Sequence, residues 1–459
     1  MTMERADYGA APLAFTPLHL EDISEPFAED VLNRRALAER LTGYIGRLRC
    51  GAVIALDAPW GEGKSWFARH WAAHLHTNEG YRVGIIDAFR EDYVEDPFLM
   101  LAAEVRRLSE ADADFTQRFT AKAAKTFGAM APAGLKLIIN AGGKWLLGTS
   151  DVTELFGDHV EAAEHTLERS AELAEHYAKQ KLEAHQAERK SMEGFRHILE
   201  EFALRDKDRP VVIFVDELDR CRPAFAVALL ERIKHFFDVP NLVFVLVMNR
   251  KQLEGAIRGV YGAETNASDY LGKFLHLSLT LPKERTSEIH RESQAARFVQ
   301  ATLLRYGISG DVGYLPSTLA ACVQLFDLSL REVERVCALR FLSELPWDGL
   351  LACLGSLRVK APDLYAALLL GNQQGFLGLL GWLEARRKTA RWIHGSVAEY
   401  LNVLIALVKI VAGQGDAGAG ETIKRERHLL FADDSRVDLA SPATGLMRAA
   451  QSLDLEFAA

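Results

Sequence analysis

An apolar run that passes directly into a glycine-containing loop is the feature that most constrains this chain. Residues 53–65 read Val-Ile-Ala-Leu-Asp-Ala-Pro-Trp-Gly-Glu-Gly-Lys-Ser. The run is typical of a buried strand, and the residues after it are typical of a helix. A loop in this position turns backbone N–H groups and the positive end of the helix dipole toward phosphate oxygens. The segment predicts a triphosphate-binding site, and its flanking strand and helix argue against a chance glycine turn.

Particular residue types in this loop predict how a nucleotide is held. Lys64 is expected to reach the β- and γ-phosphates, and the hydroxyl of Ser65 is expected to ligate Mg²⁺. Ala58 stands where the P-loop pattern has its first glycine, and alanine can serve there if φ stays negative. The predicted nucleotide-binding residues of the loop are Ala58, Pro59, Trp60, Gly61, Glu62, Gly63, Lys64, Ser65 and Trp66.

A second apolar run, far along the chain, ends in acidic residues. Residues 210–215 read Pro-Val-Val-Ile-Phe-Val, which is typical of a strand buried on both faces of a parallel sheet. Asp216 and Glu217 follow at its carboxyl end, where open α/β sheets bind ligands. We expect Asp216 to hold Mg²⁺ through its water shell and Glu217 to act as general base, with Asp219 as the next candidate base. The alternative is a strand that ends in a solvated acidic loop.

Strands and helices alternate around these two segments. Helical apolar spacing occurs over residues 29–48 and 97–109, and β-rich runs occur over residues 81–86 and 241–248. This alternation predicts an α/β fold with a parallel sheet and helices on both faces. Asn249 follows the last of these strands, where it can sense the γ-phosphate or orient the attacking water. The alternative is that it caps the helix that follows.

Composition limits the class of protein. A chain of 459 residues is long enough for two or three domains, and 49% hydrophobic with 25% charged residues is ordinary for a globular protein. The net charge of −9 argues against a broad nucleic-acid-binding surface. The five cysteines lack metal-ligand spacing and residues 1–17 lack a signal-peptide profile, so we expect reduced thiols and a cytoplasmic protein.

The region between the two motifs differs in composition from the rest. Residues 121–150 are rich in Ala, Gly and Lys, and residues 158–204 have a charged, alanine-rich helical pattern. The apolar stretch over residues 128–148 contains Lys136 and Lys144, so it falls short of the roughly 20 uninterrupted apolar residues of a spanning helix. We expect no membrane span and at most peripheral contact with a membrane surface.

The chain after residue 285 is predicted to be mostly helical. A glycine-rich segment over residues 413–420 indicates a linker or mobile loop. No His/Cys cluster, Ser/His/Asp set or nuclease-type carboxylate group stands out in this part of the sequence. The region is therefore expected to form a lid and a partner-binding domain. Helical spacing occurs over residues 295–304, 316–326, 330–342, 361–370 and 397–411.

Together these motifs resemble the KAP family of P-loop NTPases. The resemblance is carried by the loop over residues 59–65 and by the acidic run Asp-Glu-Leu-Asp-Arg-Cys over residues 216–221. It covers residues 25–345, and Leu330 departs from the proline expected at its position. Further segments similar to the family lie at residues 87–89 with 95–97, 269–274 with 281–282, and 329–336.

The resemblance implies an ATPase of the additional-strand class, in which one strand separates the acidic strand from the P-loop strand. It also implies ATP and Mg²⁺ as ligands. Arg331 is then a candidate to reach the γ-phosphate from the lid, and Arg220 to contact a phosphate or a neighbouring subunit. A structural ion pair is the alternative for both arginines. Asn33 and Arg34 precede the loop at the distance where related NTPases contact the base.

The resemblance also bears on biological role. Many relatives carry two membrane helices between the motifs, in the interval where this chain has residues 128–148. Bacterial relatives are linked to antiviral defence beside partner proteins. The resemblance therefore implies protein partners encoded in a neighbouring defence or signalling operon, and an ATP-dependent homo-oligomer.

Two functions from different classes fit these residues. One is a working ATPase that acts as a motor or switch in a multiprotein complex. The other is an ATP-binding scaffold whose partner supplies the effector activity. Glu217 favours the first, because a scaffold needs no general base. The expected domain order is a lead-in over residues 1–25, an NTPase core over 26–285 with an inserted helical segment at 115–205, a lid over 286–345 and a partner-binding region over 346–459.

Overall fold

The computed structural model contains two compact units that alternate along the chain. The sheet unit comprises Thr42–Leu56 and His74–Leu279, and the helical unit comprises Met1–Leu41, Asp57–Ala73 and Thr280–Ala459. The structure describes residues 22–28, 30–94, 96–130, 186–187, 189–283, 293–308, 313–343, 347–389, 393, 395–431, 446, 449–451 and 453.

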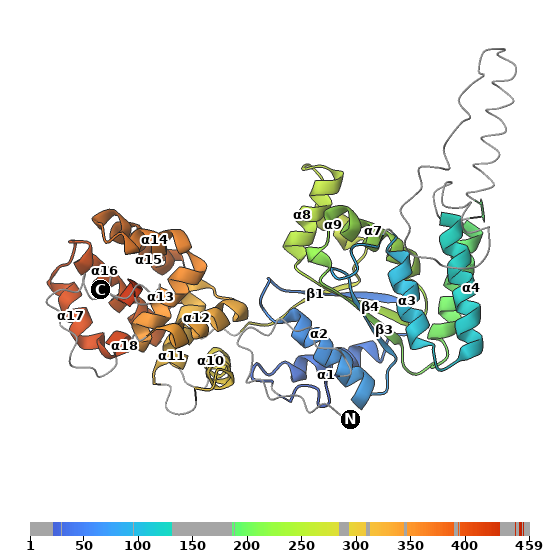
Figure 1. The fold of residues 1–459 in the computed structure, drawn as a ribbon, viewed down its shortest axis with the longest axis horizontal. Coiled ribbons are helices and arrows are strands. Elements are labelled where there is room, and N and C mark those ends of the chain that lie inside the picture. The colour runs from blue at the N-terminus through green and yellow to red at the C-terminus, as the bar shows by residue number, and fades with distance from the viewer. Residues whose placement is uncertain are drawn as a thin grey trace, which may run out of the picture. The chain divides into compact units, whose positions relative to one another are not determined.

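Five strands form the sheet, in the order β2-β3-β4-β1-β5. Figure 1 labels the neighbouring strands β3, β4 and β1. The pairs β2–β3 and β3–β4 are parallel, with Asp87 beside Asp216 in the first pair. The strand β4 lies between β3 and β1, so the separation implied by the additional-strand resemblance is confirmed, as is the predicted α/β fold. The strands are β1 (Ala52–Asp57), β2 (Val83–Asp87), β3 (Val211–Asp216), β4 (Leu242–Met248) and β5 (Leu277–Thr280).

Burial on both faces explains why the central strands could be recognised in the sequence. Every residue of β3 and β4 is buried. Alternate residues of these strands join one apolar core with the helices of the same unit, so β-branched and aromatic side chains fill the pleats. The surrounding elements are η2 (His74–Asn78), α3 (Phe98–Leu108), η3 (Leu218–Arg220), α7 (Pro223–Ile233), η4 (Lys234–Phe236), α8 (Arg250–Tyr261) and α9 (Ala267–Gly272).

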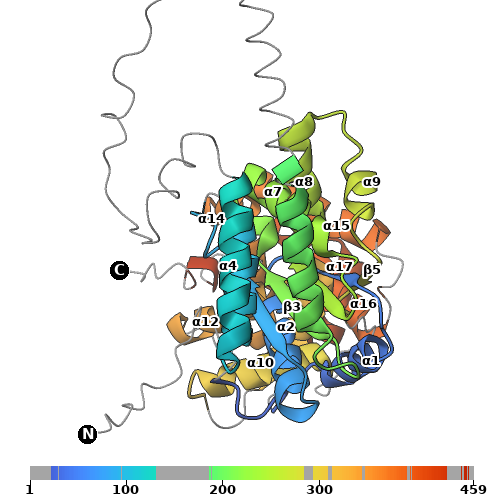
Figure 2. The ribbon, with the colours of Figure 1, turned by 90° about the vertical axis from the view of Figure 1, so that its right-hand side faces the viewer.

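The base of the predicted insert is a pair of antiparallel helices in the sheet unit. The helix α4 (Ala113–Met130) lies beside a helix over residues 189–203 (Figure 2). Arg118 forms a two-point ion pair with Glu201 at 2.7 and 3.0 Å, and the Thr126 hydroxyl donates to the Ser191 carbonyl at 2.9 Å. The buried rings of Phe115, Phe119, Phe195 and Phe202 pack together between the helices.

The edge strand β2 has one of its backbone donors satisfied by a buried side chain. Glu104 of α3 accepts from the Ile85 N–H at 2.8 Å and pairs with Arg107 at 2.7 Å. Glu104→Ala leaves this donor without its acceptor, a loss of about 1–3 kcal/mol. We expect hydrogen exchange in the β2 peptide to become about tenfold faster, measured by mass spectrometry. The exposed Glu110→Ala is the control, and equal exchange in both variants would contradict this role for Glu104.

The helical unit has its own apolar core, built from the helices after residue 293. This confirms the mostly helical C-terminal region. The glycine-rich segment over residues 413–420 was wrongly predicted as a linker throughout, because Asp416 caps a helix there by accepting from the Ala419 N–H at 2.7 Å. The helices are α10 (Gln294–Arg305), α11 (Leu315–Phe326), α12 (Leu330–Leu342), α13 (Asp348–Lys360), α14 (Pro362–Leu369), α15 (Gln373–Thr389), α16 (Gly395–Val411), α17 (Ala417–Glu426) and α18 (His428–Phe431).

The first helix begins later than the apolar spacing predicted. It is α1 (Arg35–Ile45), and not a helix from residue 29. Asn33 has a left-handed φ of 53°, which breaks a helix at that point, and Asp30 Oδ2 accepts from the Arg35 N–H at 2.7 Å. Across the described ranges, no helix combines the length and apolarity that crossing a bilayer requires. The stretch over residues 128–148 lies almost entirely outside those ranges.

Candidate nucleotide-binding site

The loop after β1 has the backbone geometry of a phosphate cradle. Gly61 and Gly63 have φ values of 84° and 73°, which residues with a side chain rarely adopt. Ala58 is buried and has no positive φ, so alanine is compatible with its position. The helix α2 (Lys64–Ala73) starts immediately after Gly63. Its first N–H groups have no partner within the helix, and they can bind an anion.

Lys64 places its charge at this loop. The residue is 9% exposed, and Nζ donates to the carbonyl oxygens of Ala58 at 2.6 Å and Pro59 at 3.2 Å. A cation held over a concave turn fits a triphosphate, because its donors can exchange carbonyl oxygens for phosphate oxygens. Ser65 follows on the first turn of α2 and is half-buried.

Arg34 braces the same loop from the segment before α1. Its guanidinium donates to the carbonyls of Glu62 at 2.8 Å and Gly63 at 3.2 Å, and the residue is 4% exposed. Burial lowers the pKa of Arg34, and the charges of Glu62 and Asp30 oppose that shift. These contacts are with the backbone of the loop, a role that differs from the predicted contact with the base. The neighbouring Asn33 is exposed.

Arg34→Ala is expected to weaken ATP binding about tenfold, measured by calorimetry. The change removes two hydrogen bonds from a charged donor to the backbone of the phosphate-binding loop. Arg34→Lys should not restore affinity, because an ammonium cannot present two donors in one plane. Arg35→Ala is the matched control, since the Arg35 side chain forms an exposed ion pair with Glu39. Full affinity in Arg34→Ala would show that the brace is dispensable.

The start of α12, which is far from the loop in the sequence, also contacts the loop. The Arg331 N–H donates to the Gly61 carbonyl at 3.1 Å. A Cβ added to Gly61 would come within 2.8 Å of the Ser329 hydroxyl, so only glycine fits there. Ser329 and Glu332 form a capping box, with the Ser329 N–H donating to Glu332 Oε2 at 2.7 Å. Arg331, the predicted lid arginine, thus touches the loop through its backbone.

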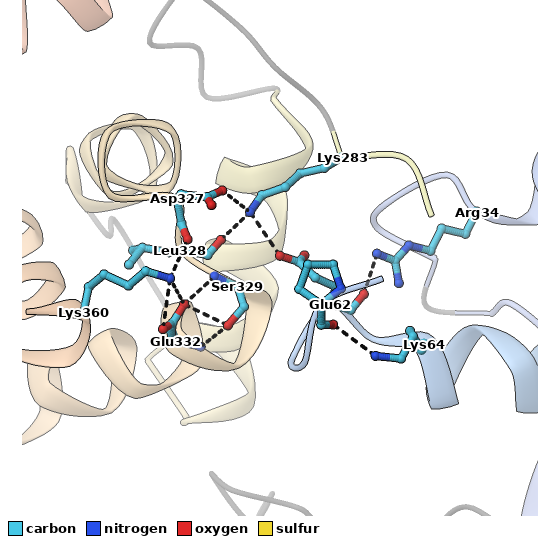
Figure 3. A network of polar contacts seen from close by, with 10 residues as sticks. Arg34, Glu62, Lys64, Lys283, Asp327, Leu328, Ser329, Glu332 and Lys360 are labelled. Atoms are coloured by element: carbon cyan, nitrogen blue, oxygen red, sulfur yellow. Dashed lines mark hydrogen bonds and ion pairs between the residues drawn. The ribbon is translucent and has the colours of Figure 1, made fainter. Parts of the chain in front are cut away.

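An ion-pair network joins the loop to the α11–α12 junction. Lys283 Nζ contacts Glu62 Oε1 at 3.0 Å, Asp327 Oδ1 at 3.2 Å and the Leu328 carbonyl at 2.8 Å (Figure 3). Burial raises the pKa of Asp327, but the charges of Lys283 and Lys360 outweigh it, and the pKa lies below its ordinary value. The sequence contained no signal for Lys283, because it belongs to no motif.

The two tryptophans of the loop region have different surroundings. Trp60 is 45% exposed. Trp66, on α2, packs its ring 4.1 Å from the His70 ring and 5.7 Å from the Phe27 ring, measured between centroids. His70 Nδ1 also accepts from the Phe27 N–H at 3.0 Å. Trp66 therefore has a packing role within the helical unit.

The acidic residues lie at the end of β3 in the sheet unit. Asp216 is 2% exposed, and its Oδ1 accepts from the Glu217 N–H at 2.8 Å. Glu217 has a left-handed φ of 59°. It forms an ion pair with Arg220 at 2.8 Å, so Arg220 has the structural ion-pair role that the sequence left as an alternative to a phosphate contact. Burial, followed by nearby carboxylates, raises the pKa of Cys221 to about 12. Carboxylates near Cys221 suit a divalent cation, because Mg²⁺ prefers oxygen ligands.

Asn249 caps a helix, which is the alternative to a phosphate-sensing role that the sequence left open. It is the N-cap of α8, and its Oδ1 accepts from the Gln252 N–H at 3.4 Å. The residue follows β4, the neighbour of β3, so the carboxyl ends carrying Asn249 and Asp216 belong to adjacent strands. The sheet unit thus contains Asp216, Glu217 and Asn249, and the helical unit contains the loop residues, Arg34 and Arg331.

A parallel sheet with an inserted strand, together with a glycine loop that starts a helix at a buried lysine, defines a P-loop NTPase. The KAP family P-loop domain matches residues 34–340, more than half of the chain. The chain therefore belongs to the KAP family of P-loop NTPases. A structure of the ORC2 protein of Aeropyrum pernix in ADPNP and ADP complexes has 12% sequence identity and a TM-score of 0.35, covering 92% of this chain and 95% of that chain. We draw nothing from a likeness this weak. No curated protein matches the sequence.

Proposed function

We propose that this protein binds ATP with Mg²⁺ and hydrolyses it. The observation that carries the proposal is the buried Lys64 ammonium, held at a loop whose two glycines have left-handed φ values. A glycine loop that starts a helix binds phosphate groups through its backbone N–H groups.

Each residue of the two motifs has a role in this proposal. Lys64 and the N–H groups of residues 61–65 bind the phosphates, while Ser65 and Asp216 are the residues that would hold Mg²⁺. The metal supplies charge neutralisation at the transferred phosphoryl group. Glu217 accepts the proton of the attacking water. Asn249 follows β4, the neighbour of β3, and the Arg331 N–H donates to the Gly61 carbonyl of the loop. We propose that both residues respond to the γ-phosphate.

Family membership supports a role in a larger assembly. We infer that hydrolysis drives a motor or switch in a multiprotein complex, of the anti-phage type known for bacterial relatives, with protein partners and an ATP-dependent homo-oligomer. The backbone contact between Arg331 and Gly61 supports such coupling, because it links the phosphate-binding loop to the helices after residue 293. We place the protein in the cytoplasm, where ATP is available and where its five unpaired cysteines are stable as thiols.

An ATP-binding scaffold with little turnover is the second candidate function. The ion pair between Glu217 and Arg220, at 2.8 Å, favours it, because a carboxylate held by a guanidinium is a weaker base. Calorimetric ATP titration and single-turnover phosphate release separate the two functions. ATP binding followed by phosphate release supports the ATPase, and binding without release supports the scaffold. Absence of ATP binding would remove both.

A further inference from the structure

The phosphate-binding loop contains a carboxylate. Glu62 lies between Gly61 and Gly63, the two residues that give the loop its curvature, and its side chain is only 10% exposed. A negative charge in this position opposes the binding of a polyphosphate, because screening by water is weak at a nearly buried group. Glu62 therefore lowers the affinity of the loop for a polyphosphate, unless a nearby cation compensates for its charge.

Lys283 is placed to provide that compensation. Its Nζ lies 3.0 Å from Glu62 Oε1 and is fixed from the other side by Asp327 Oδ1 at 3.2 Å and the Leu328 carbonyl at 2.8 Å. Figure 3 shows the three acceptors converging on this one ammonium. An ammonium has three donors, so all three are satisfied by this set of partners. The lysine is thus held at the loop by the junction between α11 and α12.

Lys360 is the natural comparison within the same network. Its side chain is 34% exposed, against 35% for Lys283. Its Nζ donates to the Asp327 carbonyl at 2.8 Å and contacts both carboxylate oxygens of Glu332, at 3.2 and 3.3 Å. It therefore supports the same junction as Lys283, through contacts with Asp327 and Glu332, two residues outside the loop. Any effect due only to stability of the junction should appear for both lysines.

We propose that Lys283 is a positioning residue that sets the affinity of the P-loop for nucleoside triphosphate by neutralising Glu62. The proposal rests on the proposed function, because it presumes that the loop binds ATP. Removing one partner of a mostly buried ion pair leaves the other charge uncompensated. Without Lys283, the carboxylate of Glu62 would repel the phosphates of the ligand that enters beside it. Without Glu62, Lys283 would no longer be needed for affinity.

The test is calorimetric titration with ATP in the presence of Mg²⁺. Lys283→Met should weaken ATP binding about tenfold, while Glu62→Gln should bind at least as tightly as the wild type. The double variant Glu62→Gln/Lys283→Met should return to within about twofold of the wild type. Lys283→Arg should retain most of the affinity, and Lys360→Met should be unchanged. Thermal unfolding of every variant identifies any that fails to fold.

A salt series distinguishes charge neutralisation from loss of local structure. The difference in ATP affinity between Lys283→Met and the wild type should shrink at high ionic strength, because screening weakens the repulsion. A purely structural loss would persist at high salt and would appear in Lys360→Met as well. The proposal is overturned if Lys283→Met binds ATP normally, if the double variant binds as weakly as Lys283→Met, or if Glu62→Gln weakens binding. If Lys283→Met does not fold, the affinity of Glu62→Gln alone tests the proposal, and weaker ATP binding than in the wild type overturns it. A wild-type protein that binds no ATP would instead remove the proposed function.

Discussion

Lys64→Ala is expected to lower the affinity for ATP by about a hundredfold or more and to abolish turnover. The lysine residue is 9% exposed and its ammonium donates to two loop carbonyls, so it provides a largely desolvated cation at the predicted phosphate site. Charge-assisted hydrogen bonds in such surroundings are roughly twice as strong as neutral ones. Removing the cation leaves phosphate charge that the backbone N–H groups cannot balance by themselves.

Calorimetry with ATP and Mg²⁺ measures this effect. Lys64→Arg should also bind poorly, because the planar guanidinium is larger than the ammonium that the loop encloses. Lys360→Ala is the control, since that lysine contacts Asp327 and Glu332, two residues outside the loop. Unchanged affinity in Lys64→Ala, with the variant folded, would withdraw the assignment of the loop to nucleotide binding.

The sheet and the loop could be predicted from the sequence because their physical causes are local. The strands β3 and β4 are buried along their whole length, so each of them appears in the sequence as an unbroken apolar run. The loop needs glycine at two left-handed positions, and both glycines are present as a recognisable spacing. Asp216 and Glu217 could be placed because they follow a strand whose end was already defined.

Contacts between distant parts of the sequence could not be predicted in the same way. Lys283 is 221 residues from Glu62, and a lone lysine after a proline has no local signature. The backbone contacts of Arg34 depend on the turn at Asn33, whose left-handed φ no pattern indicated. The helix α17 was missed because its first turns contain glycines, which are typical of loops. Its N-terminus is defined by one capping carboxylate, that of Asp416.

Glu217→Gln is expected to retain ATP binding and to reduce single-turnover phosphate release about a thousandfold. The amide keeps the shape of the side chain but cannot accept a proton from water, and general-base catalysis contributes on the order of 10²–10⁴ in rate. If ATP promotes an oligomer, the variant should hold that oligomer for longer, since it cannot return to the hydrolysed state. Light scattering with ATP present would record this.

The ion pair with Arg220 requires a control, because Glu217→Gln also removes that pair. Arg220→Ala removes the pair and keeps the carboxylate, so it should change phosphate release far less than Glu217→Gln does. Asp219→Asn tests the other carboxylate after β3 and should retain most of the turnover. Undiminished release in Glu217→Gln together with a large loss in Asp219→Asn would move the general base to Asp219. An equal loss in Arg220→Ala and Glu217→Gln would mean that the ion pair, and not proton transfer, is what turnover requires.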